Sequence, residues 1–217
     1  MFERGNHARL QWSSSTKARL ITELAGLAYE GRLQPSGNIG SGMAGGNAPP
    51  RTDGMPRIFI NYRREDTEAA ANWLHEILSS VLGEDNVFID TDDIPAGIDF
   101  VEHLRRQIDS CDVFIAMIGR RWATLTDDAG HVRLSQNDDF VRREIRAALR
   151  RDIPVIPVLV EGTPMPSEMQ LPADILPLRR RQSVALSSRQ FKEDVERLIV
   201  KICEVHRLRR TQVTQGL

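Results

Sequence analysis

Short apolar runs alternate with amphipathic stretches from residue 57 to residue 205, and this alternation restricts the fold more than any other feature of the sequence. The pattern predicts strands at 57–62, 87–89, 112–118, 153–159 and 184–186, and helices at 66–81, 100–108, 139–150 and 189–205. Repeated β-then-α units with strands this apolar predict an α/β domain, a flavodoxin-like five-stranded parallel sheet with helices on both faces. Pro154 and Pro157 in the fourth predicted strand indicate either strand ends or a position near a sheet edge.

The residues on either side of this region have a different composition. Residues 1–33 form an N-terminal extension in which a serine run and a short leucine stripe favour one short helix. Residues 34–56 are rich in Gly, Pro, Ser and Asn, and bury too little apolar surface to offset their chain entropy, so we expect a flexible linker. The domain then occupies residues 57–206, and residues 207–217 form a tail.

Composition argues against several classes of protein. The formal net charge is −1, so the chain lacks the basic field on which non-specific nucleic-acid binding depends. The 2 cysteines share no metal-ligand spacing with the 5 histidines, which argues against a metal site and a disulfide scaffold. No apolar run reaches the roughly 20 residues that span a bilayer. We therefore expect a cytoplasmic protein that binds neither nucleic acid nor membrane.

Ligand sites in open parallel sheets lie beyond the carboxyl ends of the strands, where the strand order reverses. In the flavodoxin-like order this point falls between the first and third strands, which are followed by residues 61–64 (NYRR) and by Gly119 and Arg120. The arginines make the predicted crevice basic, which suits an anionic ligand such as a pyrophosphate. The alternative is that each arginine is an ordinary solvated loop residue.

Four segments match, in order and spacing, the signatures of one known family. Residues 58–64 (IFINYRR) are an apolar strand that ends in Asn-Tyr, where the family usually has Ser-Tyr. Residues 88–97 (FIDTDDIPAG) match the second signature and the BB loop, and residues 110–118 (SCDVFIAMI) match the third strand. Residues 139–145 (DFVRREI) match the start of a glutamate-bearing helix. The chain therefore resembles the TIR (Toll/interleukin-receptor) domain family, and within it the bacterial NAD-cleaving type.

Members of this family are either signalling scaffolds or enzymes that split NAD⁺ between nicotinamide and ribose. The resemblance implies that Glu144 is the catalytic carboxylate of such an enzyme, acting in signalling or defence. On a helical wheel Glu144 lies at the edge of the buried stripe, near Phe140 and away from the arginines of its helix. No basic residue stands three or four positions away to pair with it. The alternative is an ordinary glutamate at the boundary of a surface helix.

One carboxylate is enough for this reaction. Cleavage of the bond from ribose to a positively charged nicotinamide passes through an oxocarbenium-like state. The leaving group departs neutral, so no general acid is required, and a carboxylate that holds the ribose hydroxyls stabilises the developing positive charge. NAD⁺ is then the substrate, the products are nicotinamide and ADP-ribose or a cyclic form, and no cofactor or metal is expected.

The resemblance also implies which residues bind the substrate. Arg63 and Arg64 would contact the diphosphate, and Tyr62 would border the adenine-ribose side. Phe140, where enzymatic members usually carry tryptophan, would stack on the ribose or the nicotinamide, or be a core-edge aromatic instead.

The resemblance suggests two further aromatic residues for the site. Phe100 lies near where the family places an aromatic ring over the nicotinamide, and Trp122 would form a wall of the site; the alternative for both is core packing. The residues expected to close over the site or to contact a second TIR domain belong to the BB loop and are Asp93, Ile94, Pro95 and Gly97.

A rival interpretation belongs to another functional class, because a TIR scaffold binds other TIR domains and does no chemistry. Glu144 beside a basic crevice favours the enzyme. The two roles are compatible, since enzymes of the family commonly self-assemble to complete a site, with the BB loop of one subunit meeting its neighbour. We therefore expect other TIR domains as partners and a homo-oligomer on activation.

Overall fold

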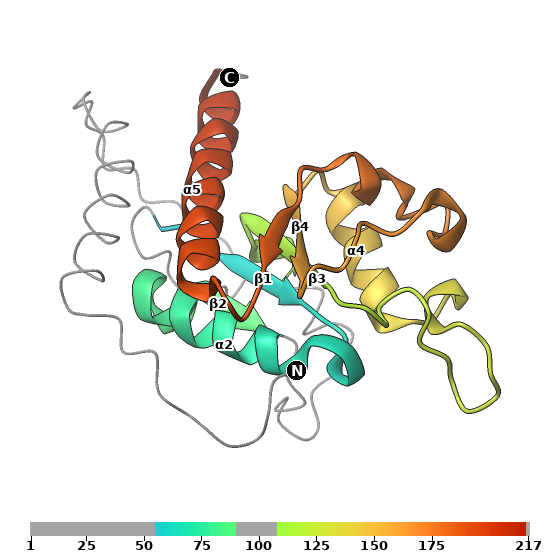
Figure 1. Ribbon diagram of the computed structural model, residues 1–217. Helices are drawn as coiled ribbons and strands as arrows, with labels where there is room; N and C mark the ends of the chain where they lie inside the picture. Colours follow the sequence, from blue (N-terminus) through green and yellow to red (C-terminus); the bar gives the residue numbers. More distant parts are fainter. Residues whose placement is uncertain (1–54, 90–107, 216–217) are drawn as a thin grey trace, which may run out of the picture.

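The computed structural model describes residues 55–89 and 108–215 (Figure 1). The N-terminal extension, almost all of the expected linker, the BB loop and Phe100 lie outside the described residues. The same is true of the helix expected at 100–108, except for its last residue.

The five expected strands form a single parallel sheet. Its order is β2-β1-β3-β4-β5, which confirms the flavodoxin-like prediction. The strands are β1 (Ile58–Asn61), β2 (Val87–Ile89), β3 (Val113–Ile118), β4 (Val155–Val160) and β5 (Val184–Leu186). Strand order reverses between β1 and β3, so a switch point lies at their carboxyl ends.

Helices cover both faces of the sheet (Figure 1). The α-helices are α2 (Arg64–Leu82), α4 (Phe140–Arg150) and α5 (Phe191–Gln215). Short 3₁₀ helices in the connections are η1 (Glu84–Asn86), η2 (Arg133–Ser135), η3 (Glu168–Gln170) and η4 (Leu176–Arg180). Apolar residues of α2 and α5 form one core cluster with the sheet, and those of α4 form a second cluster on its other face. No helix in the described residues is apolar over a length that would cross a bilayer.

The side chains of β1 alternate between these two clusters. Ile58, Ile60 and Tyr62 pack with α2 and α5, whereas Phe59 packs on the α4 side, where its ring stacks on Phe114 at a centroid distance of 5.3 Å. Because side chains of a strand point to opposite faces in turn, Asn61 belongs with Phe59 on the α4 side. The position of Tyr62 follows from the same alternation.

Pro157 lies inside β4, where it pairs with Ala116 of β3. Pairing of β4 with β5 begins only at the next residue, Val158. Pro157 therefore stands where one side of β4 has no neighbouring strand, and its missing N–H interrupts no ladder on that side. The sheet-edge alternative holds for Pro157, and Pro154 precedes the strand.

The last helix is longer than the sequence pattern predicts. It continues to Gln215, so most of the residues expected as a tail after residue 206 are helical. No glycine or proline interrupts residues 206–215, and Arg209 Nη1 donates a hydrogen bond to the carbonyl oxygen of Asp112 at 3.2 Å. This contact ties the extra turns to the residue before β3.

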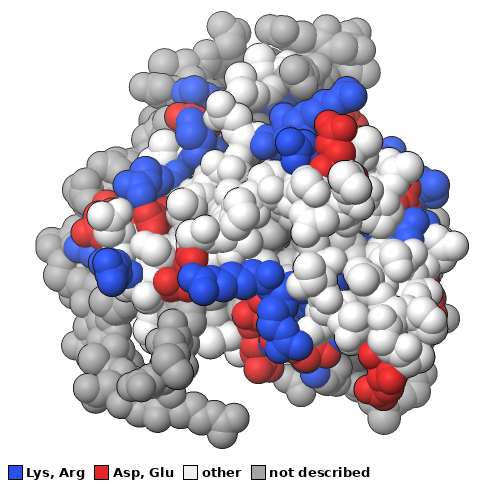
Figure 2. Space-filling model, turned by 45° about the vertical axis from the view of Figure 1, so that its right-hand side comes forward, with Lys and Arg blue, Asp and Glu red and all other residues white. Residues whose placement is uncertain are grey.

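Charged side chains of both signs lie next to one another at several places on the face shown in Figure 2, separated by broad uncharged areas. This mixing agrees with the net charge of −1. Several of the arginines form ion pairs with nearby aspartates and glutamates, and some of these pairs lie at the candidate site.

Candidate functional site

The end of β1 meets the first turns of α4 through two buried polar side chains. Asn61 Nδ2 donates a hydrogen bond to Glu144 Oε2 at 2.7 Å, and it lies 3.4 Å from the carbonyl oxygen of Val141. Glu144 is 2% exposed and Asn61 is fully buried. The Glu144 carboxylate therefore lies below the surface, at the carboxyl end of β1, with a neutral amide as donor.

The apolar pattern of α4 explains this placement. Val141, Ile145 and Ala148 are buried against the sheet and lie on one face of the helix. Glu144 precedes Ile145 and is turned toward the same face. The edge position predicted for Glu144 on the helical wheel thus becomes a buried one, because the end of β1 lies against the helix there.

A second polar pair joins β1 to α4 at the start of the helix. Arg63 Nη1 and Nη2 donate to the two carboxylate oxygens of Asp139, at 2.9 and 3.1 Å. Side-chain exposure is 1% for Arg63 and 2% for Asp139. Asp139 is also the N-cap of α4, since its Oδ1 accepts from the backbone N–H of Arg142 at 2.9 Å. The pair thus fixes the helix that carries Glu144 against the strand that carries Asn61.

This geometry changes the interpretation of Arg63. Its guanidinium is buried in an ion pair within the fold, so it is not presented to the diphosphate of a ligand in this structure. The next residue, Arg64, is the first residue of α2 and is exposed. Of the two arginines expected to bind the diphosphate, only Arg64 lies at the surface.

Two of the aromatic residues predicted for the site are core residues. Tyr62 is 6% exposed and packs on the α2 and α5 side of the sheet, opposite to Glu144. Trp122 is fully buried in the cluster on the α4 side, so the packing alternative is the one observed. The structure therefore separates Tyr62 from Asn61, Arg63 and Glu144, which it brings together.

Phe140 has a different position, because it is 44% exposed at the start of α4. The guanidinium carbon of Arg143 lies 5.6 Å from the centroid of its ring. The ring is thus at the surface, one turn before the buried Glu144. It is not the core-edge residue of the alternative interpretation.

Two arginines on the far side of α4, Arg142 and Arg146, are held in ion pairs. Arg142 is 9% exposed, with its Nε 3.1 Å from Asp174 Oδ1 and its Nη1 donating to the carbonyl oxygen of Ser135 at 2.8 Å. Arg146 Nη1 lies 3.3 Å from Asp174 Oδ2. Asp174 therefore holds the side of α4 that faces away from Glu144.

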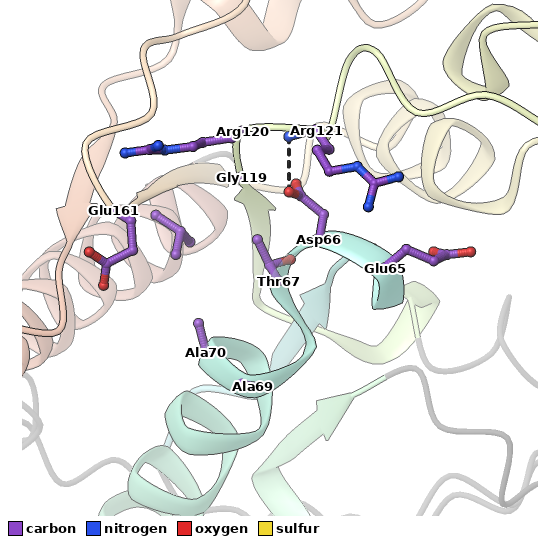
Figure 3. A pocket seen from close by; sticks show the side chains of 10 residues that line it. Glu65, Asp66, Thr67, Ala69, Ala70, Gly119, Arg120, Arg121 and Glu161 are labelled. Atoms are coloured by element: carbon purple, nitrogen blue, oxygen red, sulfur yellow. Dashed lines mark hydrogen bonds between the residues drawn. The ribbon is translucent and has the colours of Figure 1, made fainter. Parts of the chain in front are cut away.

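A pocket of about 480 Å³ opens beyond the carboxyl ends of β3 and β4, beside the first turns of α2 (Figure 3). Its lining includes Gly119 and Arg120, as expected, but the other charged residues are Glu65, Asp66, Arg121 and Glu161. Asp66 Oδ1 accepts a hydrogen bond from the backbone N–H of Arg121 at 2.9 Å. The pocket is thus mixed in charge, and neither residues 61–64 nor Glu144 are among its lining residues, so it is not the basic crevice predicted between β1 and β3.

The sequence pattern of the TIR domain family matches residues 58–199. The chain belongs to the TIR domain family. Among solved structures, the chain is similar to the TIR domains of the activated Roq1 resistosome directly recognizing the pathogen effector XopQ, with 12% identity and a TM-score of 0.40. That match covers 69% of this chain and 84% of the other. No curated protein matches the sequence.

Two residues of this TIR domain have roles that the sequence prediction missed. Asp139 caps α4 and binds Arg63, and an aspartate at the start of an apolar-periodic segment is the usual signal of an N-cap. The sequence places Asn61 at the end of the first strand, where the family usually has serine, but does not predict that it holds Glu144. No local pattern gives that contact, because Asn61 and Glu144 are far apart in the sequence.

Proposed function

We propose that this TIR domain cleaves NAD⁺ between nicotinamide and ribose, and that Glu144 is its catalytic carboxylate. The observation that supports this most is the buried carboxylate at the carboxyl end of β1, hydrogen-bonded by a neutral amide. Burying a carboxylate costs free energy that a glutamine or leucine would not. Such costly groups gather at functional sites, and the resemblance of residues 139–145 to the glutamate-bearing helix of the family's enzymes supports the same assignment.

In the proposed reaction the bond between C1′ of the ribose and the pyridinium nitrogen breaks. Both electrons of that bond stay with the nitrogen, so nicotinamide leaves neutral and C1′ becomes electron-deficient. The Glu144 carboxylate stabilises this positive charge, and a site shielded from water strengthens the interaction. Addition of water at C1′ with loss of a proton gives ADP-ribose, whereas attack by a nucleophile of the same molecule gives a cyclic product.

The burial of Glu144 bears on how the enzyme would be controlled. A ribose reaches a carboxylate that is 2% exposed only if the surrounding elements move apart. Contact with a second TIR domain would provide the free energy for this change if it favours the open arrangement. We therefore expect the rate per molecule to rise steeply with protein concentration.

The 217-residue chain and its Glu144→Gln variant test the assignment directly. Glutamine keeps the size of the side chain but removes its charge, so nicotinamide release should fall by about 100-fold or more. Glu68→Gln is the matched control, because Glu68 is exposed on α2 and its loss should leave the rate unchanged. If the Glu144→Gln variant still releases nicotinamide, the protein is an enzyme but Glu144 is not its catalytic carboxylate.

The dependence on concentration is tested with the same assay over the micromolar range. A steep rise in rate per molecule, accompanied by larger particles in light scattering, is the expected outcome. A rate strictly proportional to enzyme concentration would count against activation by self-association.

A scaffold without chemistry is the second candidate, and one observation favours it. Glu144 is buried and Arg63 is held by Asp139, so neither is presented to a ligand in this arrangement. Particles that form with no nicotinamide release at any protein concentration would identify a scaffold. Nicotinamide release that depends on Glu144 would show that the protein is not only a scaffold.

A further inference from the structure

We propose that Asn61 is the positioning residue of the site, which orients the Glu144 carboxylate and offers its own Oδ1 to a ribose hydroxyl of the substrate. This inference rests on the proposed cleavage of NAD⁺. It gives a chemical role to the residue at which this chain differs from the usual serine of its family.

The contacts of Asn61 determine which way its amide group faces. Nδ2 lies 2.7 Å from Glu144 Oε2 and 3.4 Å from the carbonyl oxygen of Val141. Both of these atoms are acceptors, so the amide nitrogen must face them, since a reversed amide would place oxygen against oxygen. Oε2 is thereby held in one position, and the plane of the carboxylate is restricted with it.

A neutral donor at this position has an electrostatic consequence. An amide donor orients the carboxylate without itself bringing a positive charge to it, whereas an arginine at this position would. The nearest basic residue along β1 is Arg63, and both of its terminal nitrogens bind Asp139. The end of β1 thus presents one neutral and one charged donor to two carboxylates of α4.

The other end of the amide supports a contact with the substrate. Asn61 Oδ1 is buried, and among the residues that the structure describes no hydrogen-bond donor contacts it. A buried acceptor without a donor is costly and uncommon, and at a functional site its donor often comes from a ligand. Because Oδ1 and Nδ2 belong to one amide, this acceptor lies beside Glu144. A ribose hydroxyl held by Glu144 is a donor of the required kind.

Asn61→Asp is the sharpest variant, because it keeps the shape of the side chain and replaces the donor by an acceptor. Two carboxylates would then share one site, so one of them takes up a proton. We expect kcat for nicotinamide release to fall by about 100-fold or more, as for other losses of a preorganised contact. The pH profile of kcat should gain an ionisation that the wild type lacks, an effect that a purely structural role would not produce.

Asn61→Ser decides the matter if the aspartate variant fails to fold. The hydroxyl still donates to Glu144 but is shorter, so kcat should lie between the wild-type value and that of Glu144→Gln. For the wild type, an NAD⁺ analogue that lacks the 2′-hydroxyl of the nicotinamide ribose should lose kcat/KM. The loss of kcat/KM should be smaller for Asn61→Ser, because Asn61 Oδ1 and the 2′-hydroxyl form one contact that this variant already lacks.

These outcomes separate the inference from the proposed function. A wild type that releases nicotinamide only when Glu144 is present, with both Asn61 variants unchanged in kcat and in pH profile, would overturn the role of Asn61 alone. If the wild type and Asn61→Ser lose kcat/KM equally with the deoxy analogue, Asn61 Oδ1 does not contact the 2′-hydroxyl. No release by the wild type would overturn the proposed function and this inference together.

Discussion

Gly119 stands at the carboxyl end of β3, where the start of α2 comes closest to it. A Cβ at this position would lie 2.4 Å from Asp66 Oδ2 and 2.6 Å from Thr67 Cγ2. Both distances are well inside van der Waals contact, and Asp66 is held by the backbone N–H of Arg121. We expect Gly119→Ala to lower the free energy of unfolding by about 1–3 kcal/mol, the usual cost of overpacking, as measured by urea unfolding.

Gly130→Ala is the control for this prediction. Gly130 has a φ of 83°, so alanine costs backbone energy there, but among the described residues beyond its chain neighbours no heavy atom lies within 4 Å of its Cβ position. The expected loss is about 1 kcal/mol from the left-handed backbone alone. If Gly119→Ala lowers the free energy of unfolding by no more than Gly130→Ala does, the side chains of Asp66 and Thr67 move aside without cost. Their close approach to Gly119 then does not affect stability.

Single residues also show why the site was only partly predictable. A strand alternates its side chains, so Asn61 and Arg63 share one face and Tyr62 must take the other. The sequence thus contained the information that these three residues do not line a single crevice. The sequence did not indicate which face of the sheet α4 covers, because that depends on contacts between distant segments. The ion pair of Arg63 with Asp139 is such a contact.

At the scale of elements, α4 is attached to β1 by the Arg63–Asp139 ion pair. Asp139→Asn keeps an N-cap, since asparagine caps helices well, but leaves the buried guanidinium of Arg63 without its carboxylate. We expect a loss of about 3–5 kcal/mol in the free energy of unfolding, as for other buried pairs that lose one partner. Chemical denaturation of the variant and the wild type measures this loss.

The double variant Arg63→Met/Asp139→Asn tests the cause of that loss. It removes the uncompensated charge, so it should be more stable than Asp139→Asn alone. A double variant as unstable as the sum of the single variants would mean that the two residues act independently. In that case the close approach of their side chains would not explain how α4 is held.

The elements themselves were largely predictable, and the exceptions have physical reasons. The five strands are short apolar runs bounded by polar residues, and α4 has a continuous apolar stripe, so local sequence specifies both. The end of α5 lacks a glycine or proline stop signal. Its last turns also contact the residue before β3, since Arg209 donates a hydrogen bond to Asp112, which is distant in the sequence.

At the scale of the whole molecule, the sheet divides the core into two apolar layers, and Cys111 lies in the layer beneath α4. Burial, with a smaller contribution from the charge of Asp112, raises the pKa of the Cys111 thiol from 9.0 to about 12. The folded protein therefore holds the thiol proton more tightly than the unfolded chain does. Above pH 9.0 the thiol ionises first in the unfolded chain, and this favours unfolding.

The free energy of unfolding should therefore be independent of Cys111 below pH 9.0 and should fall between pH 9.0 and about 12. Other groups titrate in the same range, so the comparison is with Cys111→Ala, which lacks the thiol. The alanine variant should be less stable than the wild type below pH 9.0 because of the cavity, and the gap should narrow as the pH rises. Urea unfolding of both proteins across this range measures the gap. A gap that stays constant would mean that Cys111 ionises equally easily in the folded and unfolded chains, and hence that its layer of the core admits water.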